Sequence, residues 1–248
     1  MAGTHFKGPL YYGPSKKYAY REGFAMASCA EQVVFFDDFN RVVTTNVPSG
    51  WAAAIIDTGA TVTQLATDNY PGGVLNFASD GTTEGASIYL PKQIQLSGKR
   101  FMMEDRVWSE DADDTDVQFG LSNLTATSNP EDLWTTTDTD VIAFGVLDGS
   151  AVTTMLVDKN NGGTSAVTGS ISLSDGTWHT LAILVEGNET DANMTVRGYV
   201  DGELSLKWTG ASTTVPGDLV LAPFIGARTG GDAAHNVYFD YVRFAVER

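Results

Sequence analysis

Histidine, serine and cysteine carry much of the nucleophilic chemistry of enzymes, so their positions in this chain come first. The three histidines are His5, His179 and His235. A serine triad needs a histidine beside its nucleophile, and no Gly-x-Ser-x-Gly turn is present. The single cysteine, Cys29, has no evident base near it and lies in an Ala-rich connector. We therefore expect structural or solvated histidines, a packed cysteine and no catalytic residue.

An acidic run at 110–116 is the strongest candidate for metal binding, because it holds five carboxylates in seven residues. Calcium takes about six to eight oxygen ligands from loops of this kind. However, no Asp-x-Asp-x-Asp-Gly loop occurs, and the run joins two expected strands. We expect a solvated hairpin loop and no metal, with calcium binding as the alternative. Phosphate-cradling and dinucleotide motifs are also absent, so we expect no cofactor.

Composition excludes several classes of protein. The 248 residues include 31 acidic and 15 basic side chains, a net charge of −16, and 42% are hydrophobic. This apolar fraction is enough for a sizeable core. One cysteine excludes an intramolecular disulfide framework and a multi-cysteine zinc site. The negative charge argues against nucleic acid as a partner, and no run of about 18 apolar residues predicts a membrane span.

The first 32 residues differ from the remainder and predict an extended N-terminal arm ahead of a domain at 33–248. No unbroken apolar run of about 7–15 residues occurs there, so we expect no signal peptide. Residues 1–24 carry four basic groups and one acidic group, or +3, which leaves −19 for the other 224 residues. The basic and aromatic side chains interleave. The residues expected to bind a partner are Phe6, Lys7, Tyr11, Tyr12, Lys16, Lys17, Tyr18, Tyr20 and Arg21.

Two interpretations of this arm stay open. It either folds back on its own acidic domain or docks on a partner surface, and we favour docking because an extended aromatic segment can wrap a partner. Basic and aromatic residues in alternation are also typical of single-stranded nucleic acid binding, which the acidic body disfavours.

From Val33 onward, short β-branched runs separated by Gly, Asp, Asn, Ser and Thr predict a sandwich or barrel. The expected strands are Val33–Phe39, Gly73–Ala78, Ala86–Leu90, Arg100–Val107, Val117–Leu121, Val141–Leu147, Val152–Val157, His179–Glu186, Met194–Val200, Glu203–Trp208, Leu219–Ala227 and Asn236–Val246. Asp201-Gly202 between two alternating runs predicts a type I′ hairpin. Its register places the apolar residues of 194–208, Leu204 included, on one buried face.

The last strand, 236–246, is aromatic on both faces and is expected to be central and next to the first strand. The side chains expected to form the core are Phe35 or Phe36, Trp178, Leu184, Val196, Val200, Leu206, Trp208, Phe239 and Phe244.

Three segments together resemble the concanavalin A-like lectin/glucanase superfamily in its laminin-G-like form. They are Phe35-Phe36-Asp37-Asp38-Phe39, then Asp175-Gly176-Thr177-Trp178-His179 with Tyr199-Val200-Asp201-Gly202, and finally residues 237–244, VYFDYVRF. The resemblance covers residues 33–248 and implies an all-β, two-sheet antiparallel jelly-roll sandwich whose first and last strands pair. Glycoside hydrolases of the superfamily use a Glu-x-Asp-x-x-Glu strand, and none occurs here.

The arm, with Gly-Pro-Leu-Tyr-Tyr-Gly at 8–13, resembles the arms of tailed-bacteriophage structural proteins. This resemblance implies a non-enzymatic capsid decoration (cement) protein on the outer surface of a virion. Its partners would be the major capsid protein and other copies of itself, with which it would form a homotrimer. The protein would be made in the host cytoplasm. The alternative is a glycan-binding, lectin-like module or tail adhesin, with Trp51, Trp108 and Trp134 as candidates for stacking on sugar rings. A third hypothesis is that the protein is an atypical glycosidase.

Overall fold

The computed structural model of the protein describes residues 32–39, 47–56, 59–67, 70–79, 81, 85–91, 94–96, 98–123, 140–159, 165–186, 194–210, 220–230 and 234–247. These residues form strands and no helix, as the sequence predicted. The strands are β1 (Gln32–Asp37), β2 (Ala52–Ile56), β3 (Thr61–Thr67), β4 (Tyr70–Ala78), β5 (Gly85–Tyr89), β6 (Ile94–Gln95), β7 (Phe101–Ser109), β8 (Thr115–Ser122), β9 (Val141–Leu147), β10 (Ser150–Asp158), β11 (Ser165–Ser172), β12 (Trp178–Glu186), β13 (Met194–Val200), β14 (Glu203–Gly210), β15 (Val220–Thr229) and β16 (Asn236–Glu247).

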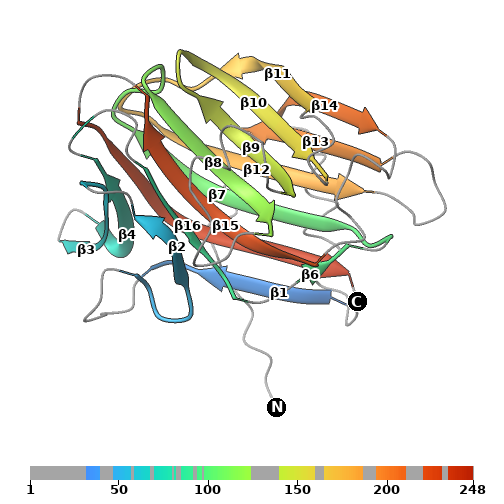
Figure 1. The fold of residues 1–248 in the computed structure, drawn as a ribbon, viewed down its shortest axis with the longest axis horizontal. Helices are drawn as coiled ribbons and strands as arrows, with labels where there is room; N and C mark the ends of the chain where they lie inside the picture. Colours follow the sequence, from blue (N-terminus) through green and yellow to red (C-terminus); the bar gives the residue numbers. More distant parts are fainter. Residues whose placement is uncertain are drawn as a thin grey trace.

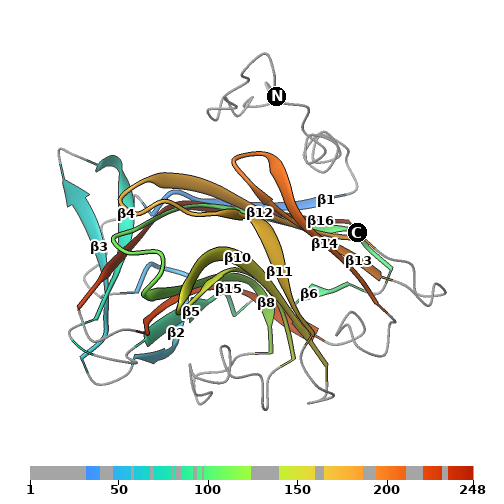
Figure 2. The same cartoon turned by 90° about the horizontal axis from the view of Figure 1, so that it is seen from above.

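The strands make two antiparallel sheets that pack face to face as a sandwich (Figures 1 and 2). Sheet A has the order β14-β13-β12-β7-β16-β4-β3, with β1 also paired to β16. Sheet B has the order β11-β10-β9-β8-β15-β5-β2, with β6 also paired to β15. This arrangement confirms the all-β, two-sheet jelly-roll expectation. No helix in the described part of the chain is long and apolar enough to cross a membrane.

The first and last strands pair as expected. In β1 and β16, Gln32 lies opposite Glu247 and Phe35 opposite Phe244, and the rings of that second pair stack at 5.0 Å. β16 also pairs with β7 along its length and with β4 at its start, so it is a central strand. The pairing of β1 with β16 therefore holds the first and last described strands in one sheet.

The hairpin between β13 and β14 has the predicted turn, because Asp201 and Gly202 both have positive φ, at 50° and 84°. The predicted register fails further along. A bulge shifts the pairing between Gly198 and Tyr199, so Ser205 points inward and Leu204 outward. Leu204 is 50% exposed, which corrects its expected burial.

The main core lies between the sheets and is built by period-two alternation. In β12, for example, Leu181, Ile183 and Val185 face sheet B. Six of the expected core residues join this cluster. These are Val196, Val200, Leu206, Trp208, Phe239 and Phe244, with Phe35 packed against them.

One core expectation needs correction and another, the burial of Leu184, is met outside the main core, for the same physical reason. The alternation that turns Leu181 inward turns Trp178 and Leu184 to the opposite face of sheet A. Trp178 is only partly buried there, whereas Leu184 is buried in a separate small cluster. Phe36, the alternative to Phe35, is exposed.

Candidate functional site

Three aromatic side chains form a row across the outer face of sheet A, the face turned away from sheet B. Trp178 of β12 lies opposite Trp108 of β7, which lies opposite Tyr238 of β16. All three are partly exposed, and the rings of Trp108 and Tyr238 are 4.9 Å apart with a 32° tilt. We call these three residues the aromatic row. Because neighbouring strands are about 4.8 Å apart, the row spans about 10 Å.

Polar groups flank the aromatic row on both sides. The Arg106 guanidinium lies 4.8 Å from the centre of the Trp178 ring and donates to Asp240 Oδ2 at 2.6 Å. A bulge between Phe239 and Tyr241 turns Asp240 toward this face. Beyond Tyr238, the next strand places Asn76, whose Nδ2 donates to Asn236 Oδ1 at 3.2 Å. The arrangement combines flat apolar faces with fixed hydrogen-bonding groups at the edges.

The aromatic row includes one of the three predicted stacking residues. Trp108 lies in it, on sheet A. Trp51 is only 7% exposed, and its Nε1 donates to Asp37 Oδ2 at 3.0 Å within the core, so its ring has no open face. Trp134 and the nine predicted arm residues lie outside the described residues. Sequence reasoning missed Trp178 and Tyr238 as partners of Trp108, although each lies an odd number of positions from an inward residue of its own strand, which was a usable signal.

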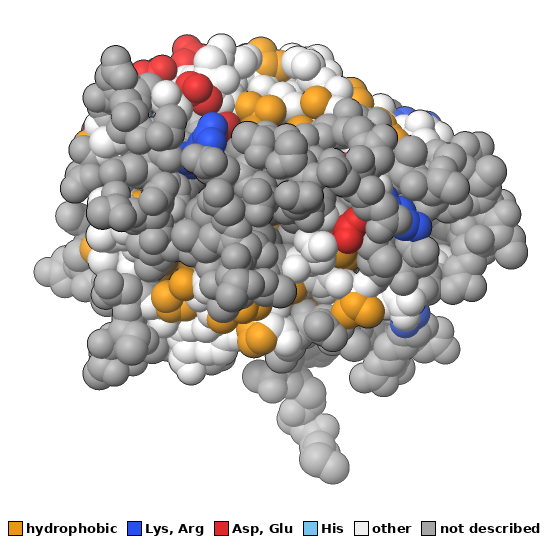
Figure 3. All heavy atoms as spheres, in the orientation of Figure 1, with side chains coloured by type: hydrophobic (Ala, Val, Ile, Leu, Met, Phe, Trp, Pro, Cys, Tyr) orange, Lys and Arg blue, Asp and Glu red, His pale blue; other side chains and the backbone are white. Residues whose placement is uncertain are grey.

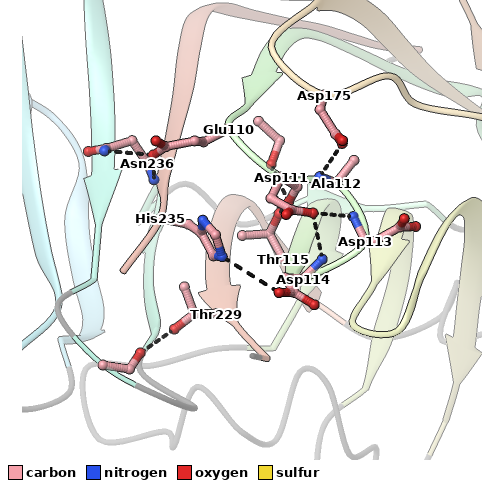
Figure 4. Close-up of polar contacts among 12 residues, drawn as sticks. Glu110, Asp111, Ala112, Asp113, Asp114, Thr115, Asp175, Thr229, His235 and Asn236 are labelled. Carbon is pink, nitrogen blue, oxygen red and sulfur yellow. Dashed lines mark hydrogen bonds and ion pairs between the residues drawn. The ribbon is translucent and has the colours of Figure 1, made fainter. Parts of the chain in front are cut away.

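The acidic run connects β7 to β8 at one end of the sandwich, and much of it is used to hold the loop. Asp111 Oδ1 accepts from the amides of Asp113 and Asp114, at 3.1 and 3.2 Å, while Asp175 Oδ1 accepts from the Ala112 amide at 2.8 Å (Figure 4). Glu110 Oε2 accepts from the amide and side chain of Asn236, which ties the loop to the start of β16. Acidic side chains gather at the upper left of Figure 3, near this connection.

His235 adds a third possible ligand, an imidazole, to two carboxylates of the acidic run. One atom each from Asp111, Asp114 and His235 lie within 4.8 Å of one another, and His235 Nε2 is 3.8 Å from Asp114 Oδ2 (Figure 4). Three such groups are fewer than the six to eight oxygens that calcium takes. These three residues therefore do not by themselves supply the ligands of a calcium site, and the hydrogen bonds of the Asp111 side chain fit a structural loop.

His179 is engaged through both ring nitrogens. Nδ1 is 2.8 Å from Asp201 Oδ2, and Nε2 accepts from the Ser174 amide at 3.0 Å. Asp201 Oδ1 also accepts from the Thr180 amide at 2.9 Å. A histidine bound in this way has no nitrogen left to activate a nucleophile, so the His179–Asp201 pair stabilises the turn at 201–202.

Three buried carboxylates, Glu104, Asp105 and Asp116, lie in different environments. Glu104 pairs with Arg243 at 2.6 Å on sheet A, and Asp116 pairs with Arg228 at 2.7 Å on sheet B. Burial nevertheless raises the pKa of Asp116, an effect that Arg228 opposes. Asp105 points into the core, and burial raises its pKa well above the ordinary value. Glu104 and Asp116 belong to opposite sheets, so they do not flank a common bond as a glycosidase pair does.

Comparison with known proteins places this sandwich in a family. The profile of the concanavalin A-like lectin/glucanases superfamily matches residues 121–245, half of the chain. No curated protein matches it. A Lotus tetragonolobus seed lectin has a TM-score of 0.57 at 10% identity, covering 86% of this chain and 98% of the lectin.

Two enzymes with the same fold are also similar in structure. An endo-1,3-β-glucanase from Streptomyces sioyaensis has a TM-score of 0.54 at 13% identity, covering 88% of this chain and 98% of the enzyme. An endo-β-1,4-glucuronan lyase from Trichoderma reesei has a TM-score of 0.52 at 18% identity, covering 86% and 94%. At these identities the likeness shows the fold alone. The matched profile and the two-sheet sandwich together establish that the chain belongs to the concanavalin A-like lectin/glucanases superfamily.

Proposed function

We propose that this protein is a non-enzymatic, glycan-binding module that holds a sugar chain against the aromatic row. The observation that carries the proposal is the alignment of Trp178, Trp108 and Tyr238 on three adjacent strands of an outer sheet face. Aromatic faces stack on the apolar faces of sugar rings, and the strands beneath them keep the rings in place. Arg106, Asp240 and Asn76 at the edges supply donors and acceptors for hydroxyl groups.

The absence of catalysis in this proposal follows from the groups described above. The sequence has no Glu-x-Asp-x-x-Glu strand. The described buried carboxylates Glu104 and Asp116 lie on opposite sheets, and each is paired with an arginine of its own sheet. Fold likeness to lectins and to glucanases is compatible with either role. We propose binding because the aromatic row offers a surface for stacking, and the carboxylate at its edge, Asp240, is paired with Arg106.

The test is a glycan array followed by calorimetry on the strongest hit. Trp108→Ala should weaken binding about tenfold, or ~1.4 kcal/mol, because it removes the central ring of the row. Leu204→Ala is the matched control, since it removes an exposed apolar side chain elsewhere on sheet A. Binding that Trp108→Ala leaves unchanged would reject the site, and a glycan that the protein cleaves would reject the non-enzymatic role.

A second candidate is decoration of a phage capsid, with localisation on the virion surface. It is supported by the division of charge between residues 1–24, at +3, and the rest of the chain, at −19. In this hypothesis the arm binds the major capsid protein, and copies of the chain associate as a trimer. Deleting residues 1–24 should then leave a folded domain that no longer co-sediments with phage heads. Unchanged occupancy of the heads would contradict docking through the arm.

A further inference from the structure

The outer face of sheet A carries a second feature, a cluster of buried apolar side chains. Met102, Ala182, Leu184 and Tyr199 pack together there, on β7, β12 and β13, and each is between 2% and 6% exposed. We call these four residues the outer cluster. Their neighbours in sequence, such as Met103 and Ile183, belong to the main core, so the outer cluster faces away from it.

Described elements do not explain this burial. Sheet B covers one side of sheet A, and no described strand lies on the other side (Figure 2). On the same strands β7 and β12, the aromatic row remains partly exposed. A bare sheet face would leave a tyrosine and a methionine similarly exposed, so the burial of the outer cluster requires a cover that is local to it.

A buried carboxylate beside the outer cluster indicates the chemistry of this cover. Glu104, which lies opposite Ala182, is 1% exposed. Its Oε1 accepts from the Tyr241 hydroxyl at 2.7 Å and from Arg243 at 2.6 Å. Its Oε2 has no hydrogen-bond partner among the described residues. An unsatisfied buried carboxylate oxygen is costly, so a cover that brings a cationic donor is favoured.

The chain itself arrives at this face from its N-terminal side. β1 begins at Gln32, and Val34 lies opposite Ala245, which in turn lies opposite Met102 of the outer cluster. Residues 1–31 contain six aromatic residues and four basic residues, against two glutamates. Extended, 31 residues reach up to about 100 Å. The distance from β16 to β13 is only three strand spacings, about 14 Å.

We propose that residues 1–31 fold back over the outer face of sheet A of the same chain, with aromatic side chains on the outer cluster and a basic side chain at Glu104 Oε2. The short tether at Gln32 favours this chain over another copy, because it holds the segment at millimolar effective concentration. The outer cluster and the aromatic row lie at different positions along β7 and β12, so an arm on the outer cluster leaves the aromatic row open to a glycan. This assignment competes with the decoration hypothesis, in which the same residues bind a capsid subunit.

A nitroxide in the middle of the arm tests the proposal on the full chain. Cys29→Ser combined with Ser15→Cys leaves one cysteine, at position 15, for the label. The amide signals of Ala182 and Tyr199 should be lost by paramagnetic broadening, and should return when the nitroxide is reduced. Amides of β8, β9 and β10 on the far sheet should keep their signals. Uniform weak broadening, or none beyond β1, would overturn the proposal because it would show an undocked arm.

A mixed sample distinguishes an arm of the same chain from an arm of another copy. It contains isotope-labelled protein without a nitroxide and unlabelled protein that carries one. Docking within one chain predicts no loss of signal in the mixture. Loss at Ala182 and Tyr199 there would mean that the arm of another copy covers the face, which contradicts the proposal as stated. As a second measurement, deletion of residues 1–31 should increase binding of an apolar fluorescent dye, whereas deletion of residues 1–5 should not.

Discussion

Asp105 shows how one side chain in the core makes stability depend on pH. It is fully buried between Leu181 and Val242 on neighbouring strands, and burial raises its pKa, with the charges of Glu104 and Asp240 adding to the effect. In the unfolded chain the same carboxyl loses its proton near pH 4. As the pH rises above that value, the unfolded state releases a proton that the folded state still holds.

We therefore expect the free energy of unfolding of the wild type, relative to Asp105→Asn, to fall as the pH rises from about 4 toward the raised pKa. The amide of the variant stays neutral throughout, so its own curve lacks this contribution. Urea denaturation at several pH values measures the difference. Asp113→Asn, which changes an exposed carboxylate, is the control. A free energy of unfolding of the wild type that rises with pH, relative to that of Asp105→Asn, would contradict the proposed environment of Asp105.

Two tryptophans of one sheet provide a matched comparison of burial. Trp208 is in the main core, whereas Trp178 is partly exposed in the aromatic row. Trp208→Ala should cost about 3–5 kcal/mol of unfolding free energy. Trp178→Ala should cost clearly less, because much of its ring already contacts solvent and Arg106. Equal losses in denaturant titrations would mean that Trp178 is buried in solution.

Among the strands, Ser205 of the edge strand β14 connects sheet A to sheet B by hydrogen bonds. The bulge in β14 turns it inward, where its Oγ lies 2.6 Å from Thr153 Oγ1 of β10. The same oxygen accepts from the amides of Ser170 and Ile171 in β11, both at 3.2 Å. One hydroxyl thus connects three strands at the side of the sandwich.

Ser205→Ala should destabilise the domain by about 1–3 kcal/mol, since it removes the side-chain acceptor of two amides and one of the two partners of the buried Thr153 hydroxyl. Ser172→Ala, at an exposed position of β11, should cost much less. Thermal unfolding of both variants measures the difference. Equal melting temperatures would show that water replaces the lost hydroxyl and that the two edges are not held by this contact.

The strands that were predicted from sequence share a clear pattern, and those that were missed lack it. β13 and β14 alternate apolar and polar residues on either side of the Asp201-Gly202 turn, so local signals suffice. β11, SAVTGSIS, is mostly small and polar, and β6 has only two residues. Such strands form because a neighbouring strand offers its hydrogen bonds, which a single sequence does not reveal. The bulge that exposes Leu204 has the same origin.

The aromatic row could be predicted only in part, because it depends on register between strands far apart in sequence. Trp108, Trp178 and Tyr238 meet through the β7–β12 and β7–β16 pairings. Outward orientation of each follows from its own strand's alternation. Their adjacency follows from the sheet order, which residue spacing does not specify.

For the whole molecule, the relevant feature is the excess of 31 acidic over 15 basic side chains. The net charge is −16, and acidic side chains are visible on the face shown in Figure 3. Like charges on a compact body repel one another, so the folded state is penalised more than the expanded chain. Salt shortens the range of this repulsion, from about 30 Å at 0.01 M to about 8 Å at 0.15 M.

We therefore expect the melting temperature to rise when sodium chloride is increased from about 0.01 M to about 0.15 M. Choline chloride at the same ionic strength should give the same rise, because screening does not depend on the identity of the cation. Calcium chloride at matched ionic strength tests whether Asp111, Asp114 and His235 bind the ion, since their three ligand atoms lie within 4.8 Å of one another. A further increase with calcium that Asp114→Asn removes would mean that the loop binds the ion, against the structural role assigned here. A melting temperature that is constant or falls with sodium chloride would mean that ion pairs such as Arg106–Asp240 outweigh the repulsion.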